Sequence, residues 1–264
     1  MFHGAHSDET PLPLSRMKRR QFIRNATAWA FTGLIFVPRL RGQSPGIPGS
    51  STAFLKPRAA SAAGFSIVAH TAKGSTNALS VTSDAIDTTG ATALYVAVAW
   101  YSAGSTVLTD LKGNTWVASS NYGGGGNANT KIYHCISSPT VGTGHTFTFT
   151  AAYAAIAVIA VSGSTVTADG ESGANANGTS LQPGSITPTG NGAFLVSPIG
   201  FNPDATMSIN SSFTISDAIV FDSGVGHVGI AFAYYTQPTA AAINPTWSWT
   251  GTVDAAAAMR AYKP

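Results

Sequence analysis

The segment Thr146-Phe147-Thr148-Phe149-Thr150 returns one hundred residues later as Thr246-Trp247-Ser248-Trp249-Thr250. In both copies aromatic side chains alternate with hydroxyl side chains, which is the pattern of a β-strand with one buried face. Two tryptophans on one face of a strand are also typical of a sugar-stacking platform. Because both copies are aromatic at the same positions, we predict that these rings are core residues.

The likeness between the two parts of the chain extends beyond this segment. Thr89-Gly90 recurs as Thr189-Gly190, and Ala93, Val96 and Thr106 recur as Ala193, Val196 and Thr206. A unit of about 100 residues used twice predicts an all-β, antiparallel β-sandwich of jelly-roll or immunoglobulin-like type. We expect one sandwich over residues 64–264, built of the halves 64–163 and 181–264. Two tandem immunoglobulin-like domains joined near residues 164–180 are the alternative.

Short runs of β-branched and aromatic residues, separated by Gly, Pro and Asn, fill the chain from Phe65 onward. The predicted strands are 65–71, 91–101, 106–111, 116–120, 131–136, 145–150, 154–162, 193–201, 213–221, 227–236, 246–250 and 254–262. The alanine-rich run 254–262 has helical propensity, but its match to 154–162 favours a strand. Thr167–Ser180 is predicted as the connection between the halves, with Asp169 and Glu171 as a weak metal candidate.

The sharpest local motif is Asp110-Leu111-Lys112-Gly113-Asn114-Thr115-Trp116. Asp, Gly and Asn together favour a tight hairpin turn. The alternative is a calcium loop in which Asp110 and Asn114 supply oxygen ligands. Calcium takes six to eight oxygens and this motif has one carboxylate, so we favour the turn.

This motif also carries a resemblance to a family. The motif is followed by a Gly-rich loop, a Tyr-containing strand, the Thr/Phe strand and Val161-Ser162-Gly163. The order resembles a group of exported, functionally uncharacterised bacterial β-sandwich proteins with an Asp-x-x-Gly-Asn-Thr-Trp/Tyr hairpin, and it covers roughly Phe65 to Tyr262. The resemblance implies a β-sandwich, sometimes joined to surface or carbohydrate-active proteins, and it assigns no catalytic or binding residue.

Three aromatic residues are candidates for ligand contact: Tyr122 in a Gly-rich loop, and Trp100 and Tyr101 at the end of a predicted strand. Cys135, the single cysteine, is predicted to be a small buried residue without a disulfide partner. The four histidines of residues 64–264 form no HExxH or HxH motif. We therefore assign no catalytic residue. The one cofactor that stays open as an alternative is calcium, with Asp110 and Asn114 as its ligands.

The first part of the chain predicts export. Arg19-Arg20, with Phe22 two places later, precedes an apolar stretch at 26–37, which resembles a twin-arginine signal over residues 1–41. The apolar stretch is shorter than the roughly 20 residues that span a bilayer, so no stable membrane span is expected. Met17 is an alternative start. Residues 42–63, rich in Pro, Ser, Gly and Ala, are predicted to be a disordered linker.

Charge separates the leader from the remainder of the chain. Residues 1–63 hold nine basic and two acidic side chains, whereas residues 64–264 hold five basic and nine acidic ones. An acidic body neutralises few phosphates, which argues against nucleic acid as a partner. We expect a non-catalytic structural or adhesion module that is periplasmic, extracellular or at the cell surface. A carbohydrate-binding module is the alternative, and a secreted hydrolase is the third hypothesis.

Overall fold

The computed structural model describes residues 64–75, 79–101, 106–123, 128–202, 204–220 and 228–264. These residues belong to one compact unit, Lys56–Pro264. The predictions for the export signal (Arg19, Arg20 and Phe22) and for the linker at 42–63 lie outside the described residues. Within the described ranges, no helix has the length and apolar character needed to cross a membrane.

The described chain is built of β-strands. They are β1 (Ser66–Gly74), β2 (Ser80–Thr82), β3 (Ala93–Trp100), β4 (Val107–Asp110), β5 (Val117–Ala118), β6 (Tyr122–Gly123), β7 (Asn129–Cys135), β8 (Phe147–Thr150), β9 (Ala154–Ser162), β10 (Thr167–Leu181), β11 (Ala193–Asn202), β12 (Ser208–Ile209), β13 (Thr214–Ile219), β14 (Gly229–Gln237) and β15 (Trp247–Lys263). The all-β prediction is confirmed, and the alanine-rich run that ends β15 is a strand as expected.

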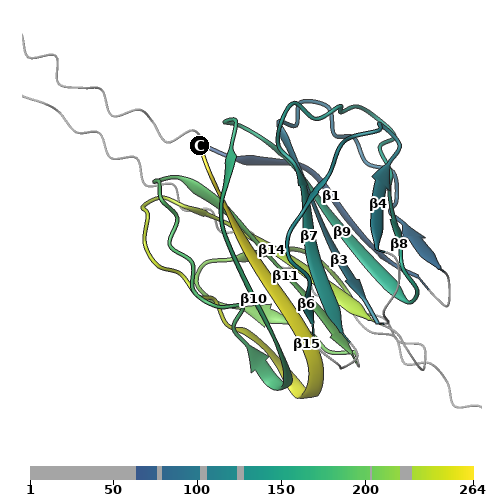
Figure 1. The fold of residues 1–264 in the computed structure, drawn as a ribbon, viewed down its shortest axis with the longest axis vertical. Helices are drawn as coiled ribbons and strands as arrows, with labels where there is room; N and C mark the ends of the chain where they lie inside the picture. Colours follow the sequence, from purple (N-terminus) through teal and green to yellow (C-terminus); the bar gives the residue numbers. More distant parts are fainter. Residues whose placement is uncertain (1–63, 76–78, 102–105, 124–127, 203, 221–227) are drawn as a thin grey trace, which may run out of the picture. The chain divides into compact units, whose positions relative to one another are not determined.

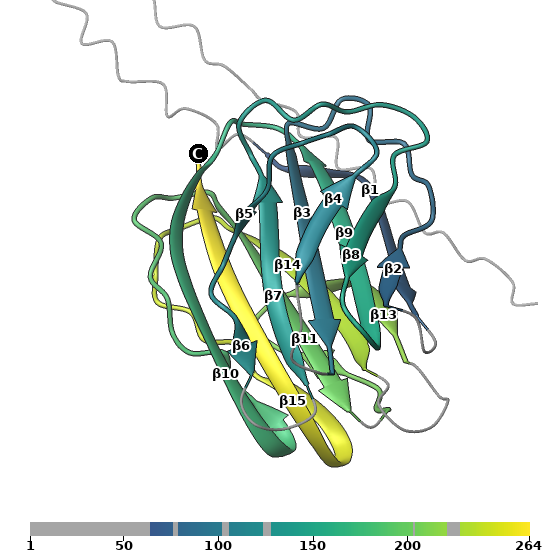
Figure 2. The same cartoon turned by 45° about the vertical axis from the view of Figure 1, so that its right-hand side comes forward.

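The strands form three antiparallel sheets (Figures 1 and 2). The first large sheet has the order β1-β9-β3-β7-β5, with β6 also paired to β7. The second large sheet has the order β10-β15-β11-β14-β13, with β12 also paired to β15. A small sheet has the order β2-β8-β4. The predicted antiparallel β-sandwich architecture is therefore confirmed.

Strands in the middle of the large sheets are covered on both faces. Every residue of β3 is buried, and so is every residue of β9 except its last. Both strands are nearly continuous in apolar residues, the pattern that predicts a central strand. On one face β3 and β9 pack against the small sheet, and on the other they pack against the second large sheet.

The two large sheets pack face to face, and their strands contact each other in pairs. β1 contacts β13, β9 contacts β14, β3 contacts β11, β7 contacts β15 and β6 contacts β10. The strands of the first sheet from β1 to β7 therefore face the strands of the second sheet from β13 to β15, and β3 faces β11 in the middle of the interface. The repeat in sequence stays a prediction.

Polar contacts join the large sheets at both edges. At one edge, His70 Nδ1 of β1 lies 2.9 Å from Asp217 Oδ2 of β13. At the other edge, Glu171 of β10 accepts hydrogen bonds from the Ser120 amide and the Tyr122 hydroxyl, at 3.0 and 3.2 Å. The apolar interface between the sheets is thus closed by side-chain bonds on either side.

The segment Thr167–Ser180 is not the connection that the sequence analysis predicted. It forms most of β10, which pairs with β15 from Thr167 to Leu181 with two register shifts, at Ala168/Gly170 and Gly178/Ser180. Gly, Asn and Asp have low β-propensity, so the composition of this segment indicated a loop. Pairing with β15 along its full length outweighs that local preference.

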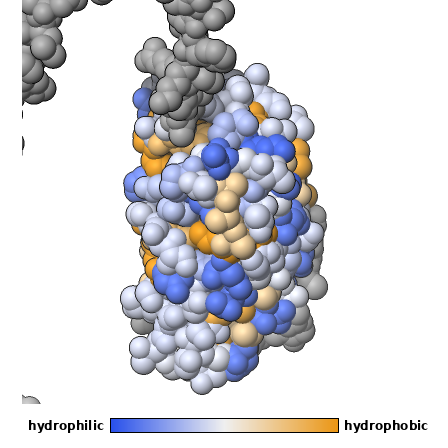
Figure 3. All heavy atoms as spheres, turned by 90° about the vertical axis from the view of Figure 1, so that its left-hand side faces the viewer, coloured by the Kyte–Doolittle hydropathy of each residue, from blue (hydrophilic) through white to orange (hydrophobic). Residues whose placement is uncertain are grey.

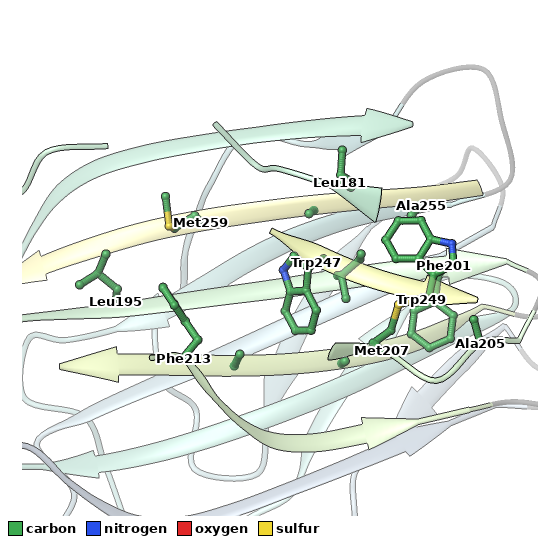
Figure 4. Close-up of a cluster of buried hydrophobic side chains, with 14 of the residues drawn as sticks. Leu181, Leu195, Phe201, Ala205, Met207, Phe213, Trp247, Trp249, Ala255 and Met259 are labelled. Atoms are coloured by element: carbon green, nitrogen blue, oxygen red, sulfur yellow. The ribbon is translucent and has the colours of Figure 1, made fainter. Parts of the chain in front are cut away.

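Trp247 and Trp249 lie in the core, as predicted, and are 0% and 8% exposed. Figure 4 shows both rings on the first part of β15, among Leu195, Phe201 and Met207. The equivalent rings of β8, Phe147 and Phe149, are fully buried against β3 and β9. The alternation in the quoted segments is therefore the alternation of buried and outward-facing positions in both halves.

Small residues set the closest approach of the two large sheets. An added methyl group at Gly200 would lie 2.7 Å from Ala99 Cβ and 2.9 Å from the Asn129 carbonyl oxygen. Both atoms belong to the opposite sheet and neither can rotate away. The alanines around this point allow β3 and β11 to pack tightly.

We expect Gly200→Ala to lower the free energy of unfolding by about 1–3 kcal/mol, the usual cost of overpacking a tight core. Chemical denaturation followed by tryptophan emission measures the loss. Gly178→Ala is the matched control, because a methyl group there meets no atom within 4 Å. Equal stabilities for the two variants would contradict the close approach of the sheets at Gly200.

Candidate functional site

The Asp110 turn is a dense network of hydrogen bonds around a carboxylate that is 0% exposed. Oδ1 accepts from the Lys112 amide at 2.8 Å, the Asn114 side-chain amide at 3.1 Å and His145 Nε2 at 2.9 Å. Oδ2 accepts from the Asn114 amide at 3.1 Å and from Trp116 Nε1 at 2.7 Å. Lys112, Asn114 and Trp116 of the motif, together with His145, thus hold one buried anion in the turn.

The carboxyl group of Asp110 is held in its charged form by these bonds. Burial by itself favours the neutral acid, but the hydrogen bonds from His145, Trp116, Lys112 and Asn114 together outweigh it. The pKa of Asp110 is therefore lower than its ordinary value of 3.8.

The calcium alternative does not fit this geometry. Both carboxylate oxygens of Asp110 already accept protein donors. The remaining oxygen of the proposed pair, Asn114 Oδ1, accepts the Thr140 amide at 2.6 Å and faces the Cys135 thiol at 3.8 Å. A cation would have to displace these donors. The turn interpretation is the one that the contacts support.

His145 continues the network inward, with Asp110 on one nitrogen and Thr88 on the other. His145 Nδ1 lies 3.0 Å from Thr88 Oγ1, and that hydroxyl also bonds the backbone of Gly142. An acid, a histidine and a hydroxyl in line have the order of a nucleophilic triad. Thr88 and His145 are both 0% exposed, so no substrate reaches the hydroxyl. The hydrogen bonds from Asp110 through His145 to Thr88 hold three loops together.

A pocket of about 330 Å³ opens beside the turn. Hydroxyl, amide and apolar groups line it: Gly113, Asn114, Thr115, Val117, His134, Cys135, Ile136, Ser137, Ser138 and Thr140. Cys135 is 8% exposed, as predicted. Burial and the nearby charge of Asp110 raise the pKa of the Cys135 thiol, so this sulfur is a poor nucleophile. The sequence does not predict this pocket, because its lining comes from two strands, β5 and β7, and from two loops, the segment before β5 and the segment after β7.

The three aromatic residues predicted to contact a ligand do not share a face. Trp100 is 3% exposed and packs on Phe149 toward the small sheet, with ring centroids 5.7 Å apart. Tyr101 and Tyr122 pack on the other side of the first large sheet. Because neighbouring strand residues point to opposite faces, Trp100 and Tyr101 cannot form one platform. The prediction that Trp100 stacks on a ligand is not compatible with its burial.

Tyr122 is held in place by β10 of the opposite large sheet. Its ring lies directly over Gly173, and its hydroxyl donates to Glu171 at 3.2 Å. Glu171 also pairs with Arg260, whose Nη1 lies 3.2 Å from Glu171 Oε2. Burial raises the pKa of the Tyr122 phenol, and the Glu171 carboxylate adds to the rise. The ring is thus a contact between sheets.

The second metal candidate, Asp169 with Glu171, is divided between two sets of partners. Asp169 accepts hydrogen bonds from the amide and hydroxyl of Thr189, and its Oδ1 lies 3.8 Å from Lys263 Nζ. Glu171 bonds to Ser120, Tyr122 and Arg260. No group of three or more His, Cys, Asp or Glu side chains within the described ranges is placed to hold a metal ion.

His134 is a buried histidine at the interface of the large sheets. It is 3% exposed, and its Nδ1 lies 3.3 Å from the Tyr262 hydroxyl. Burial, and to a smaller extent the nearby charge of Arg260, lower the pKa of His134 from 6.5 to about 4. The imidazole is therefore neutral at physiological pH, where it packs as a polar core residue.

We expect Gly173→Ala to displace the Tyr122 ring, because the added methyl group would overlap ring carbons. The phenol would then lose its burial and its contact with Glu171, so its pKa would fall toward 10. Absorbance of the phenolate during a pH titration measures the change, and Tyr122→Phe assigns it. Gly170→Ala is the control, since its methyl group meets only Ile186 at 3.9 Å. An unchanged titration in Gly173→Ala would count against the contact.

Comparison with known proteins adds no relative at this point. No protein-family model, curated protein or solved structure matches the chain.

Proposed function

We propose that this chain is an exported, non-catalytic β-sandwich protein that acts as a structural or adhesion module at the cell surface or outside the cell. The observation that carries the proposal is that tryptophans in the described part of the chain bond to other groups of the fold. Trp247 Nε1 donates to Ser197 Oγ at 3.1 Å, Trp249 Nε1 to the Gly178 carbonyl at 2.8 Å, and Trp116 Nε1 to Asp110 at 2.7 Å. These rings stabilise the fold, and the surface is left to other residues.

Hydroxyl side chains occupy the outward-facing positions instead. Thr82, Thr148 and Thr109 are aligned across the small sheet, and Thr82 and Thr148 are joined by a 2.9 Å hydrogen bond. The corresponding row of the second half is Ser180, Ser248 and Ser208. Figure 3 shows a face on which pale colours of intermediate hydropathy predominate. Only 9% of the residues of the chain are charged. A surface with many hydroxyl groups and few charges favours contact with neutral, hydrated material.

The export part of the proposal is tested in cells that carry a twin-arginine pathway. The paired change Arg19→Lys with Arg20→Lys should leave the chain in the cytoplasmic fraction, while Arg24→Lys, outside the pair, should not. For the surface part, protease treatment of intact cells should cleave the unchanged chain, and its deletion should reduce cell attachment. Unchanged chain recovered only from the cytoplasm would refute the proposal.

A carbohydrate-binding module is the second candidate, and the pocket beside Asn114 favours it. A volume of about 330 Å³ lies at the lower end of the range for small-molecule sites, and hydroxyl and amide groups line it. This site differs from the residues that the sequence suggested for sugar contact. It uses no stacked tryptophan.

A glycan array and a pull-down on insoluble polysaccharides separate the two candidates. Under the structural proposal, the full chain is retained on no glycan, and its tryptophan emission stays blue-shifted and unchanged. Selective retention that is lost in Ser137→Trp, a change that fills the pocket from its exposed rim, would favour carbohydrate binding. Thr143→Trp, at an exposed position outside the pocket lining, is the control.

A further inference from the structure

β10 forms a long outer edge of the second large sheet (Figures 1 and 2). It pairs with β15 on one side, and no other described strand pairs with its second side. Between its two register shifts, the run Gly170–Gly178 is regular. From Ser172 to Leu181 the strand contains no charged residue and no proline. An edge with these properties presents unpaired backbone donors and acceptors to another strand.

The other edges in the described part of the chain carry the features that prevent such pairing. β1 has a register shift at Ile67/Ala69, and its Lys73 is exposed and paired with Asp84. β13 has a shift at Ile215/Asp217 and is six residues long. β2, β4, β5, β6 and β12 have only two to four residues each. Short strands, bulges and lysines are the usual protection of an edge, and the middle of β10 has none of them.

We propose that the β10 edge pairs antiparallel with the β10 edge of a second copy of this chain. Antiparallel pairing of one strand with itself is closed by a two-fold axis, so it stops at a dimer. The regular run is centred on Ala174, which places Gly173 opposite Asn175 and Glu171 opposite Asn177 of the second copy. The shared edge joins the two second sheets into one continuous sheet.

The positions of the charges on β10 favour this partner and this direction. Asp169 and Glu171 both lie at the start of the strand, so antiparallel pairing carries the acidic ends of the two copies apart. A parallel pair would bring them side by side. Both carboxylates are also compensated within their own chain, Glu171 by Arg260 and Asp169 by Lys263. Asn175, the exposed side chain beside the axis, is a neutral amide that lies diagonally across from its copy, where the two amides can bond. Asn177, the other exposed side chain of the central run, is also neutral and donates to Asp254 of its own chain.

Sedimentation velocity of the full chain over a micromolar concentration series tests the proposal. We expect a reversible monomer–dimer equilibrium in the unchanged chain. Asn175→Lys places two like charges close to the axis and should weaken the dimer by about tenfold or more. Thr214→Lys, an exposed position on the edge strand β13, should leave the equilibrium unchanged.

Three results would overturn the proposal: a monomer at every concentration, a dimer that Asn175→Lys leaves intact, or a series of larger oligomers. Circular dichroism and the unfolding transition of each variant establish that the monomer remains folded. The inference does not depend on the proposed function, because oligomeric state is read without any adhesion or glycan assay. Failure of the export or glycan experiments would leave it standing.

Discussion

Asp110→Asn lowers the free energy of unfolding by about 3–5 kcal/mol, because each buried donor left without an acceptor costs about 1–3 kcal/mol. The amide that replaces the carboxylate has one acceptor oxygen, whereas the site offers five donor contacts. Its NH₂ group then faces other N–H donors. The loss is large because Asp110 and His145 are both 0% exposed at the side chain, so water cannot replace the missing bonds.

Denaturation in guanidinium chloride, followed by tryptophan emission and far-ultraviolet circular dichroism, measures this loss. Asp87→Asn is the matched control: Asp87 also accepts a turn amide, that of Thr89 at 2.9 Å, but it lies on the surface. The control should change stability little. A loss below about 1 kcal/mol for Asp110→Asn, the value of a single ordinary hydrogen bond, would show that the network does not hold the turn.

We expect the stability of the protein to fall as the pH is lowered from 6.5 to about 4, with His134 as the group responsible. In the folded chain the pKa of His134 is lowered to about 4, whereas its value in the unfolded chain is close to 6.5. The unfolded state therefore takes up a proton first, and the native state loses stability until its own imidazole is protonated. A difference of this size corresponds to about 3 kcal/mol.

His134→Gln should flatten the profile in this window, because the variant has no imidazole to protonate. Tyr262→Phe is the control. It removes the hydroxyl that contacts His134 but leaves the imidazole buried, and burial is the largest cause of the shift, so the slope should persist. Asp110 acts in a separate window: its lowered pKa contributes stability that is lost only as the pH falls below 3.8. Equal slopes in the wild type and His134→Gln between pH 6.5 and 4 would assign the acid sensitivity to other groups.

The parts of the fold that could be predicted from sequence are those in which local pattern and tertiary environment agree. Apolar runs predicted the central strands β3 and β9, and alternation predicted the buried rings of β8 and β15. β10 was missed because Gly, Asn and Ser carry no strand signal of their own. Its strand character comes from β15, a partner more than sixty residues away in sequence, which no local window contains.

The candidate site likewise has a part that local sequence predicts and a part that depends on residues distant in sequence. The turn at Asp110 follows from residues within seven positions of each other, so the sequence predicted it. His145 and Thr88 join the network from distant segments, and nothing in their local sequence indicates the contact. Tyr122 was interpreted as a ligand-stacking residue because it stands beside a Gly-rich loop. Its partner in the structure is Gly173. Because glycine has no side chain, its residue type does not indicate the contact with Tyr122.

The polar contacts at the two edges of the large sheets have a mechanical consequence. Small residues let β3 and β11 approach closely at Ala99 and Gly200, while the rings of Tyr95 and Phe194 pack against each other farther along the same pair of strands. His70 with Asp217 on one side, and Tyr122 with Glu171 on the other, oppose sliding of one sheet past the other at the two edges of the interface. A pulling force that shears the two sheets therefore has to break polar contacts at both edges as well as the ring packing between them.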